Sequence, residues 1–142
     1  MKLKQISVFL ENRPGHVNHI CRVLAKNNID IATLTLADTA EFGLLRLIIR
    51  EWEKAVAVLE SEGCAVNVTD VMAIEVPDTP GGLANVLAIA EQGGLSVEYM
   101  YAFSLGNSDT AQLVFRFGDM EKAATCFGEA GINVLAAVEF YR

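Results

Sequence analysis

One duplicated stretch constrains this chain more than any other feature of its sequence. The chain reads NRPG from residue 12 and DTPG from residue 78; in both places alternating apolar residues precede the motif and a helical apolar pattern follows it. The two glycines, Gly15 and Gly81, lie 66 positions apart in a chain of 142 residues. Self-similarity at a fixed spacing indicates a repeated structural unit, so the sequence predicts two similar units in tandem.

Aligning the halves at this spacing matches a strand with a strand and a helix with a helix. Residues that alternate in character predict a half-buried strand, and apolar residues at i, i+3, i+4 and i+7 predict one face of a helix. The matched sets are Ile6, Val8 and Leu10 with Met72, Ile74 and Val76 in the strand, and Val17, Ile20, Cys21 and Leu24 with Leu83, Val86, Leu87 and Ala90 in the helix. Both helices are expected to end in residues that accept a left-handed conformation, at 27–28 and 93–94.

The rest of each half repeats as well. The turn between the second and third predicted strands is longer in the second half, which increases the spacing to 68. The predicted second strands contain Ile29, Ile31 and Thr33 in one half and Leu95, Val97, Tyr99 and Tyr101 in the other; the third strands contain Leu45, Leu47 and Ile49 and then Leu113, Phe115 and Phe117. A second helix follows in each half and ends before Gly63 or Gly131, and closing strands are expected at 64–68 and 132–138.

Each half therefore predicts strand–helix–strand–strand–helix–strand. The fold class is α+β, with two ferredoxin-like βαββαβ units at 1–70 and 71–142, each an antiparallel sheet with both helices on one face. Because residues 64–76 run without a break from one unit into the next, we expect the two sheets to lie side by side as one eight-stranded sheet.

Composition narrows the classes of partner and compartment. The formal net charge is −7, whereas nucleic-acid and anionic-membrane surfaces are built from clustered Lys and Arg, so we expect neither partner. Three widely spaced cysteines provide no disulfide framework and no metal pair, and we interpret them as small buried apolar residues. The apolar run in the opening segment is too short for a signal peptide. We therefore expect a cytoplasmic protein.

The Pro-Gly turn has a structural and a functional interpretation. Proline is favoured in the first turn of a helix, and Asn12, Asp78 or Thr79 could cap the helices that follow. Glycine also leaves the first free N–H groups of the helix uncovered, which suits a carboxylate. Duplication alone could have copied a purely structural turn, so both interpretations stay open.

The βαββαβ plan with NRPG and DTPG between first strand and first helix resembles the ACT domain, over essentially the whole chain. The resemblance implies a small-molecule sensor, most often for amino acids. It also implies that the units pair and that the ligand lies at the seam between them, against the strand-to-helix loop of one unit and the second strand of its neighbour. The residues implied are Asn12, Arg13, Pro14, Gly15, His16, Val17, Asn28, Ile29 and Asp30, and Asp78, Thr79, Pro80, Gly81, Gly82, Leu83, Leu95 and Ser96. The two loops differ: Arg13 could bind a carboxylate through two hydrogen bonds, whereas Asp78 could pair with an ammonium group.

A sensor without an attached catalytic domain is expected to act in trans, with a metabolic enzyme as its partner, and a homo-oligomer is expected. The alternative is an assembly module that docks onto such an enzyme and binds no ligand. His16 and His19 are too few for a metal site and are expected to be exposed helix residues. No nucleophile, base and orienting group can be assembled, so we expect neither an enzyme nor a cofactor. Tyr99, Tyr101 and Phe103 either belong to the core or form an aromatic wall at the seam.

Overall fold

The computed structural model describes residues 2–11, 13–38, 42–103 and 109–141. The chain divides into two compact units, which we call the N-terminal unit (Lys4–Thr69) and the C-terminal unit (Met1–Leu3 with Asp70–Arg142). Asn12 lies outside the described residues, and so does the side chain of Phe103.

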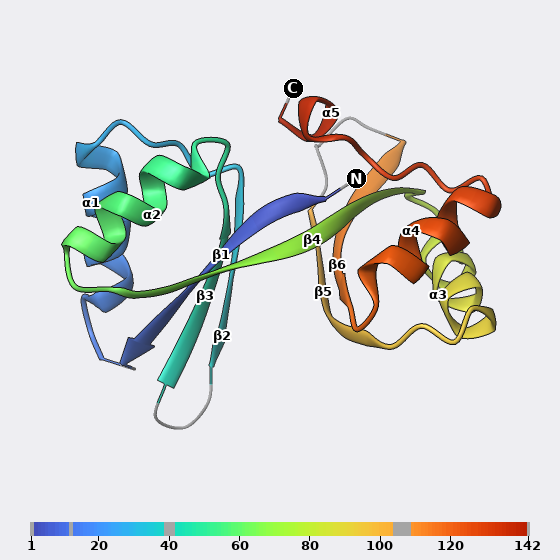
Figure 1. Cartoon of the computed structure of the whole chain (residues 1–142), viewed down its shortest axis with the longest axis horizontal. Helices are drawn as coiled ribbons and strands as arrows, with labels where there is room; N and C mark the ends of the chain where they lie inside the picture. The colour runs from blue at the N-terminus through green and yellow to red at the C-terminus, as the bar shows by residue number, and fades with distance from the viewer. Residues whose placement is uncertain (1, 12, 39–41, 104–108, 142) are drawn as a thin grey trace. The chain divides into compact units, whose positions relative to one another are not determined.

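The N-terminal unit is an antiparallel sheet with two helices on one face (Figure 1). Its elements are β1 (Leu3–Glu11), α1 (His16–Lys26), β2 (Thr33–Asp38), β3 (Phe42–Ile48), α2 (Trp52–Ser61) and the first part of β4 (Ala65–Pro77). The strands lie in the order β2-β3-β1-β4, and β3 is antiparallel to both of its neighbours, with Leu45 opposite Val8 on one side and Leu36 on the other.

The core of this unit contains the apolar residues that the sequence pattern selects. Its buried residues include Ile6, Val8, Leu10, Ile20, Leu24, Leu45, Leu47 and Ile49. The opposite, helix-free face carries the intervening strand residues, among them Phe9 and Phe42, which are 54% and 58% exposed. The alternation thus assigned the strand faces correctly, but it did not predict aromatic side chains on the exposed face.

The C-terminal unit repeats the plan with one change. It contains the rest of β4, then α3 (Gly82–Gln92), β5 (Val97–Phe103), β6 (Thr110–Phe117), α4 (Met120–Glu129) and a short α5 (Ala137–Phe140). The strands lie in the order β4-β6-β5, antiparallel, with an irregularity between Val97 and Tyr99. Its core contains Met72, Ile74, Val76, Val86, Ala90, Leu113, Phe115 and Phe117, as predicted.

The sequence predicted eight strands, and the described residues form six. Two differences account for this. The closing strand of one unit and the opening strand of the next form a single strand, β4. The strand predicted at 132–138 is wrong, because the segment makes only an isolated bridge between Val134 and Ile74 before α5 begins. Leu135, before α5, and Phe140, its last residue, are both buried.

Other local differences are small. Ile29 and Ile31 precede β2, which begins at Thr33, and Leu95 precedes β5. Asn28 has φ of 55°, in agreement with the predicted left-handed end of α1. The three cysteines are half-buried rather than buried, and all three are free thiols.

Candidate functional site

The two Pro-Gly turns have the same backbone conformation. Gly15 and Gly81 are the N-cap residues of α1 and α3, with φ of 86° and 91°. A Cβ at either position would meet no heavy atom within 4 Å, so the left-handed backbone, rather than lack of space, requires glycine. Neither helix has a side-chain cap, so the predicted capping role of Asp78 or Thr79 is wrong, because a left-handed glycine occupies the cap position itself.

In the N-terminal unit the turn is held by a histidine. The backbone N–H of Glu11 lies 3.1 Å from His16 Nδ1, and the carbonyl oxygen of Glu11 lies 3.3 Å from the same nitrogen. The N–H of Arg13 donates to the carbonyl of Glu11 over 2.9 Å, and Arg13 Nε lies 3.5 Å from Glu11 Oε2. The turn thus presents a guanidinium beside a carboxylate, both of them exposed.

The C-terminal unit closes the same turn with backbone alone. Pro77 stands where the first unit has Glu11, so it has no N–H to donate, and Gly82 stands where the first unit has His16. A Cβ at Gly82 would lie 2.2 Å from the carbonyl oxygen of Pro77. The two turns therefore share a backbone shape but differ in the side chains that they can hold.

A cavity of about 710 Å³ lies beside the first turn, entirely within the N-terminal unit. It is lined by Phe9, Leu10, Glu11, Arg13, Pro14, Gly15, His16, His19, Phe42, Glu62, Gly63, Cys64 and Ala65. Four of these residues were predicted from the sequence, namely Arg13, Pro14, Gly15 and His16. The remainder come from the end of β1, the start of β3, α1 and the segment that leads from α2 into β4. Of these, only His19 was considered for a functional role from the sequence, as a metal ligand.

The α2–β4 turn adds ionisable groups to the cavity. Glu62 Oε2 lies 3.9 Å from His19 Nε2, at the outer limit of an ion pair. Burial raises the pKa of the Cys64 thiol above its usual 9.0, and the nearby Glu62 carboxylate raises it further. Cys64 is therefore held as a neutral thiol. Among the described residues no group of three or more His, Cys, Asp and Glu side chains is arranged to hold a metal ion.

Several predicted site residues also make structural contacts. Ile29 is 5% exposed and belongs to the core, and Val17 packs against the same core. Asp30 accepts a hydrogen bond from the N–H of Ile31. In the other unit, Leu83 and Leu95 pack against the core.

The remaining predicted residues lie around the second turn and the start of β5. Asp78, Thr79 and Pro80 are exposed, and the backbone N–H of Asp78 donates to the carbonyl of Asp109 over 2.9 Å. The carbonyl of Ser96 accepts from the N–H of Gly118 over 3.1 Å. These contacts are made by backbone, so they leave the side chain of Asp78 available for a ligand without identifying one.

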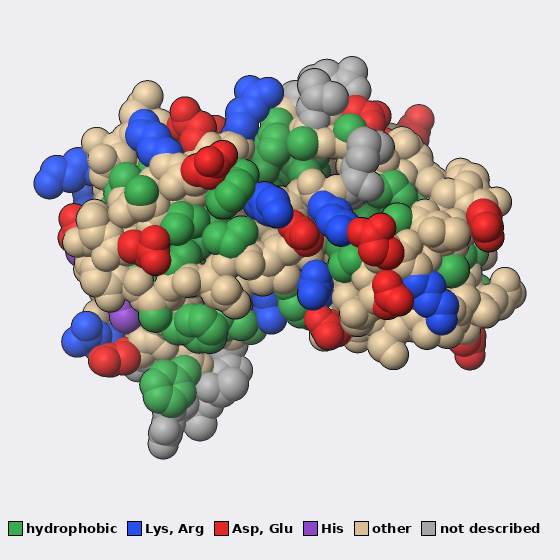
Figure 2. Space-filling model, in the orientation of Figure 1, with side chains coloured by type: hydrophobic (Ala, Val, Ile, Leu, Met, Phe, Trp, Pro, Cys, Tyr) green, Lys and Arg blue, Asp and Glu red, His purple; other side chains and the backbone are tan. Residues whose placement is uncertain are grey.

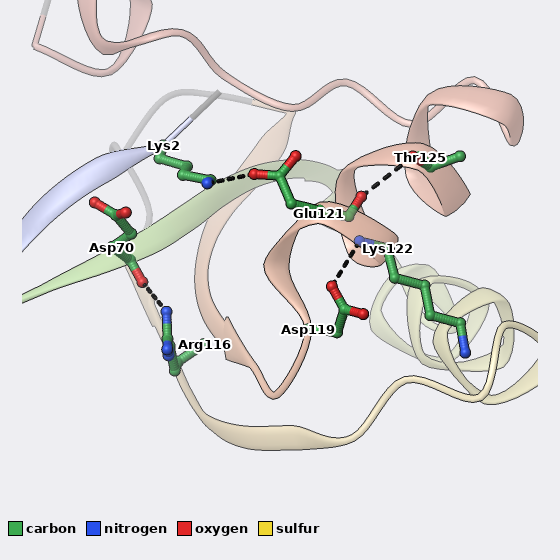
Figure 3. A network of polar contacts seen from close by, with 7 residues as sticks. All are labelled: Lys2, Asp70, Arg116, Asp119, Glu121, Lys122 and Thr125. Atoms are coloured by element: carbon green, nitrogen blue, oxygen red, sulfur yellow. Dashed lines mark hydrogen bonds and ion pairs between the residues drawn. The ribbon is translucent and has the colours of Figure 1, made fainter.

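A polar network within the C-terminal unit explains why residues at the start of the chain belong to it (Figure 3). Lys2 Nζ donates to Glu121 Oε1 of α4 over 2.5 Å. This hydrogen bond, with the charge of Glu121, raises the pKa of Lys2. Arg116 Nη1 donates to the carbonyl of Asp70 over 2.8 Å. The Lys2–Glu121 ion pair is exposed and the Arg116–Asp70 contact is partly buried, and both join segments of the unit that are far apart in the sequence.

Comparisons with known proteins agree on the kind of fold. The family described as an ACT domain pair matches residues 1–139. The crystal structure of protein BT0572 from Bacteroides thetaiotaomicron is 39% identical, with a TM-score of 0.94 over 100% of this chain and 97% of that one. The regulatory subunits of aspartate kinase from Thermus thermophilus, ligand-free, and from Thermus flavus are 15% identical with a TM-score of 0.65; alignments cover 92% of this chain and 93% and 94% of theirs, respectively.

A comparison with curated proteins found no match. Within the described residues, no helix is long and apolar enough to cross a membrane.

Proposed function

Because the chain belongs to the ACT domain pair family, we propose that it is a regulatory protein that senses a small molecule, an amino acid, and catalyses no reaction. The observation that carries the proposal is the cavity beside the first Pro-Gly turn. Its volume of about 710 Å³ is within the usual range of small-molecule sites, about 300–1,000 Å³. Arg13 beside Glu11 offers a partner for a carboxylate and one for an ammonium group, which together make up an amino acid's head group.

We further propose that the ligand binds at a Pro-Gly turn, with the second strand of a neighbouring ACT unit completing the site. In this proposal the units are residues 1–70 and 71–142, and the candidate sites are the two sets predicted from the sequence. The ligand would favour one arrangement of the paired units, and a separate metabolic enzyme would respond to that arrangement. The Thermus thermophilus neighbour is titled a regulatory subunit, and action in trans on an enzyme is proposed here on that precedent.

Self-association is part of this proposal, and the edge strands support it. β2 ends the strand order, and Leu34 and Leu36 on it are 48% and 51% exposed. Edge strands of monomeric proteins are commonly protected by charges or proline, and β2 contains no proline and one charged residue, Asp38, at its end. A second copy pairing along β2 would cover both leucines.

The test is a thermal-shift screen of the purified protein against the twenty amino acids. A ligand present at 100 times its Kd stabilises the native state by about 2.7 kcal/mol, which is about 8 °C at roughly 3 °C per kcal/mol. Gly15→Ala should remove this shift, whereas Gly131→Ala should retain it. Gly131 is the matched control because it has φ of 73° and equally open surroundings, yet lies outside the proposed sites.

A folded protein that no amino acid stabilises would contradict the sensing proposal. It would favour the second candidate, an assembly module that docks onto a metabolic enzyme without a ligand. That module is favoured by the exposed apolar edge of β2, and its test is the oligomeric state of Leu36→Glu by sedimentation.

A further inference from the structure

The cavity in the N-terminal unit has a wall formed by two phenylalanines, which the corresponding positions of the second unit lack. Phe9 and Phe42 lie on the helix-free face of neighbouring antiparallel strands, where Phe9 is opposite Leu44 and Phe42 is opposite Glu11. This register makes the two phenylalanines diagonal neighbours at the end of the sheet. Each is more than half exposed, and both line the cavity.

The two units can be compared position by position, because residues that correspond in the repeat pair with strand residues that also correspond. In the C-terminal unit Pro77 is opposite Thr110 and Glu75 is opposite Gln112, so Glu75 corresponds to Phe9 and Thr110 to Phe42. The same fold therefore tolerates polar side chains at both positions. The requirements of the sheet do not explain two exposed phenylalanines in the N-terminal unit.

The polar residues that line the cavity also differ from their counterparts in the second unit. Arg13, His16, His19 and Glu62 correspond to Thr79, Gly82, Asn85 and Ala130. None of these four counterparts carries a charge. At these corresponding positions, the two phenylalanines and the four ionisable side chains therefore occur in the N-terminal unit alone.

The charged and ionisable side chains of the cavity lie to one side of Phe9 and Phe42 and do not surround them. In Figure 2, histidine, basic and acidic side chains meet hydrophobic ones at lower left, near the end of β1 and the start of α1. Arg13 Nε and Glu11 Oε2 are 3.5 Å apart on the turn that follows Phe9. A ligand that used all of these groups would carry a carboxylate and an ammonium group at one end and a flat apolar group at the other.

We propose that this cavity selects an amino acid with an aromatic side chain, and that each chain binds one such ligand, in its N-terminal unit only. The proposal rests on amino-acid sensing as proposed above and adds the class of side chain and the number of sites. The ligand ring packs against Phe9 and Phe42, Arg13 binds the carboxylate, and Glu11 accepts from the ammonium group. Aromatic pairs add to affinity beyond the area that they bury, so phenylalanine, tyrosine or tryptophan binds more tightly than leucine.

The test is calorimetric titration of the full chain with phenylalanine, tryptophan, leucine and alanine. We expect one site per chain, with phenylalanine or tryptophan at least about tenfold tighter than leucine. The double variant Phe9→Glu/Phe42→Thr, which introduces the second unit's own residues, should lose most of this preference. The control Met100→Thr removes an apolar side chain that is 39% exposed and outside the cavity, and it should bind as the unaltered protein does.

Head-group recognition has its own comparison. Phenethylamine lacks the carboxylate and 3-phenylpropionate lacks the ammonium group, so both should bind more weakly than phenylalanine. Alkylation of Cys64 provides a local readout, because this thiol lines the cavity and Cys126 does not. Bound phenylalanine should slow modification of Cys64 and leave that of Cys126 unchanged.

The outcomes separate this inference from the proposed function. Binding of a non-aromatic amino acid with equal or higher affinity, or two equivalent sites per chain, would overturn the inference and leave amino-acid sensing intact. Undiminished aromatic preference in the folded double variant would also overturn it. Absence of binding by any amino acid would contradict both.

Discussion

Replacing Gly82 with alanine separates two opposing effects at one position. Gly82 is the first residue of α3 and has no left-handed φ, so backbone conformation does not exclude alanine. Helix propensity alone favours the change by up to about 1 kcal/mol. The tertiary structure opposes it, because the new Cβ would lie 2.2 Å from the carbonyl oxygen of Pro77.

The size of the opposing effect follows from what must move. The Cβ and the oxygen must separate by about 1 Å or more to reach an ordinary non-bonded distance. The obstacle is backbone at the end of β4 rather than a flexible side chain, so we assign the upper part of the usual overpacking range, about 3 kcal/mol. After the propensity gain, Gly82→Ala should lower the free energy of unfolding by about 2 kcal/mol.

Urea and thermal unfolding followed by circular dichroism would measure this change. A loss of about 2 kcal/mol corresponds to a Tm lower by roughly 6 °C. The neighbouring Gly81→Ala serves as a comparison, since its cost of about 1–2 kcal/mol comes from the left-handed backbone alone. Gly82→Ala that unfolds at the same temperature as the unaltered protein, or higher, would refute the steric argument.

Three further predictions concern single side chains. Asp119→Ala removes the side-chain cap of α4, an acceptor 3.0 Å from the N–H of Lys122, and should cost about 1 kcal/mol in urea unfolding; an unchanged midpoint would contradict this. Phe127→Ala empties a fully buried site and should cost about 3–5 kcal/mol by the same assay, so a loss below 1 kcal/mol would show that the core relaxes. The raised pKa of Cys64 leaves less thiolate at any pH near 8, so iodoacetamide should modify Cys64 more slowly than an unstructured cysteine peptide in mass-spectrometric time courses; equal rates would show that its pKa is not raised.

The sequence predicted the repeated units well because their signals are local. Alternation placed Ile6, Val8 and Leu10 on the helix-covered face, and the Pro-Gly pair placed the strand-to-helix turn. Both depend on residues within one or two turns of chain, where periodicity directly reports which side is buried. The same approach failed at 132–138, where the segment makes one isolated bridge, between Val134 and Ile74, before α5 begins at Ala137.

The candidate site was only partly predictable, for a physical reason. Arg13 and His16 could be singled out from the turn, but the cavity also needs Phe42 from β3 and Cys64 from the α2–β4 turn. Sequence periodicity reports that a residue is buried or exposed and does not report which distant segment approaches it. That the second turn has no room for a side chain at Gly82 likewise became clear only from the position of the Pro77 carbonyl beside it. The sequence by itself determined two repeated units and their turns, whereas tertiary packing brought distant segments together around the first turn to form a cavity.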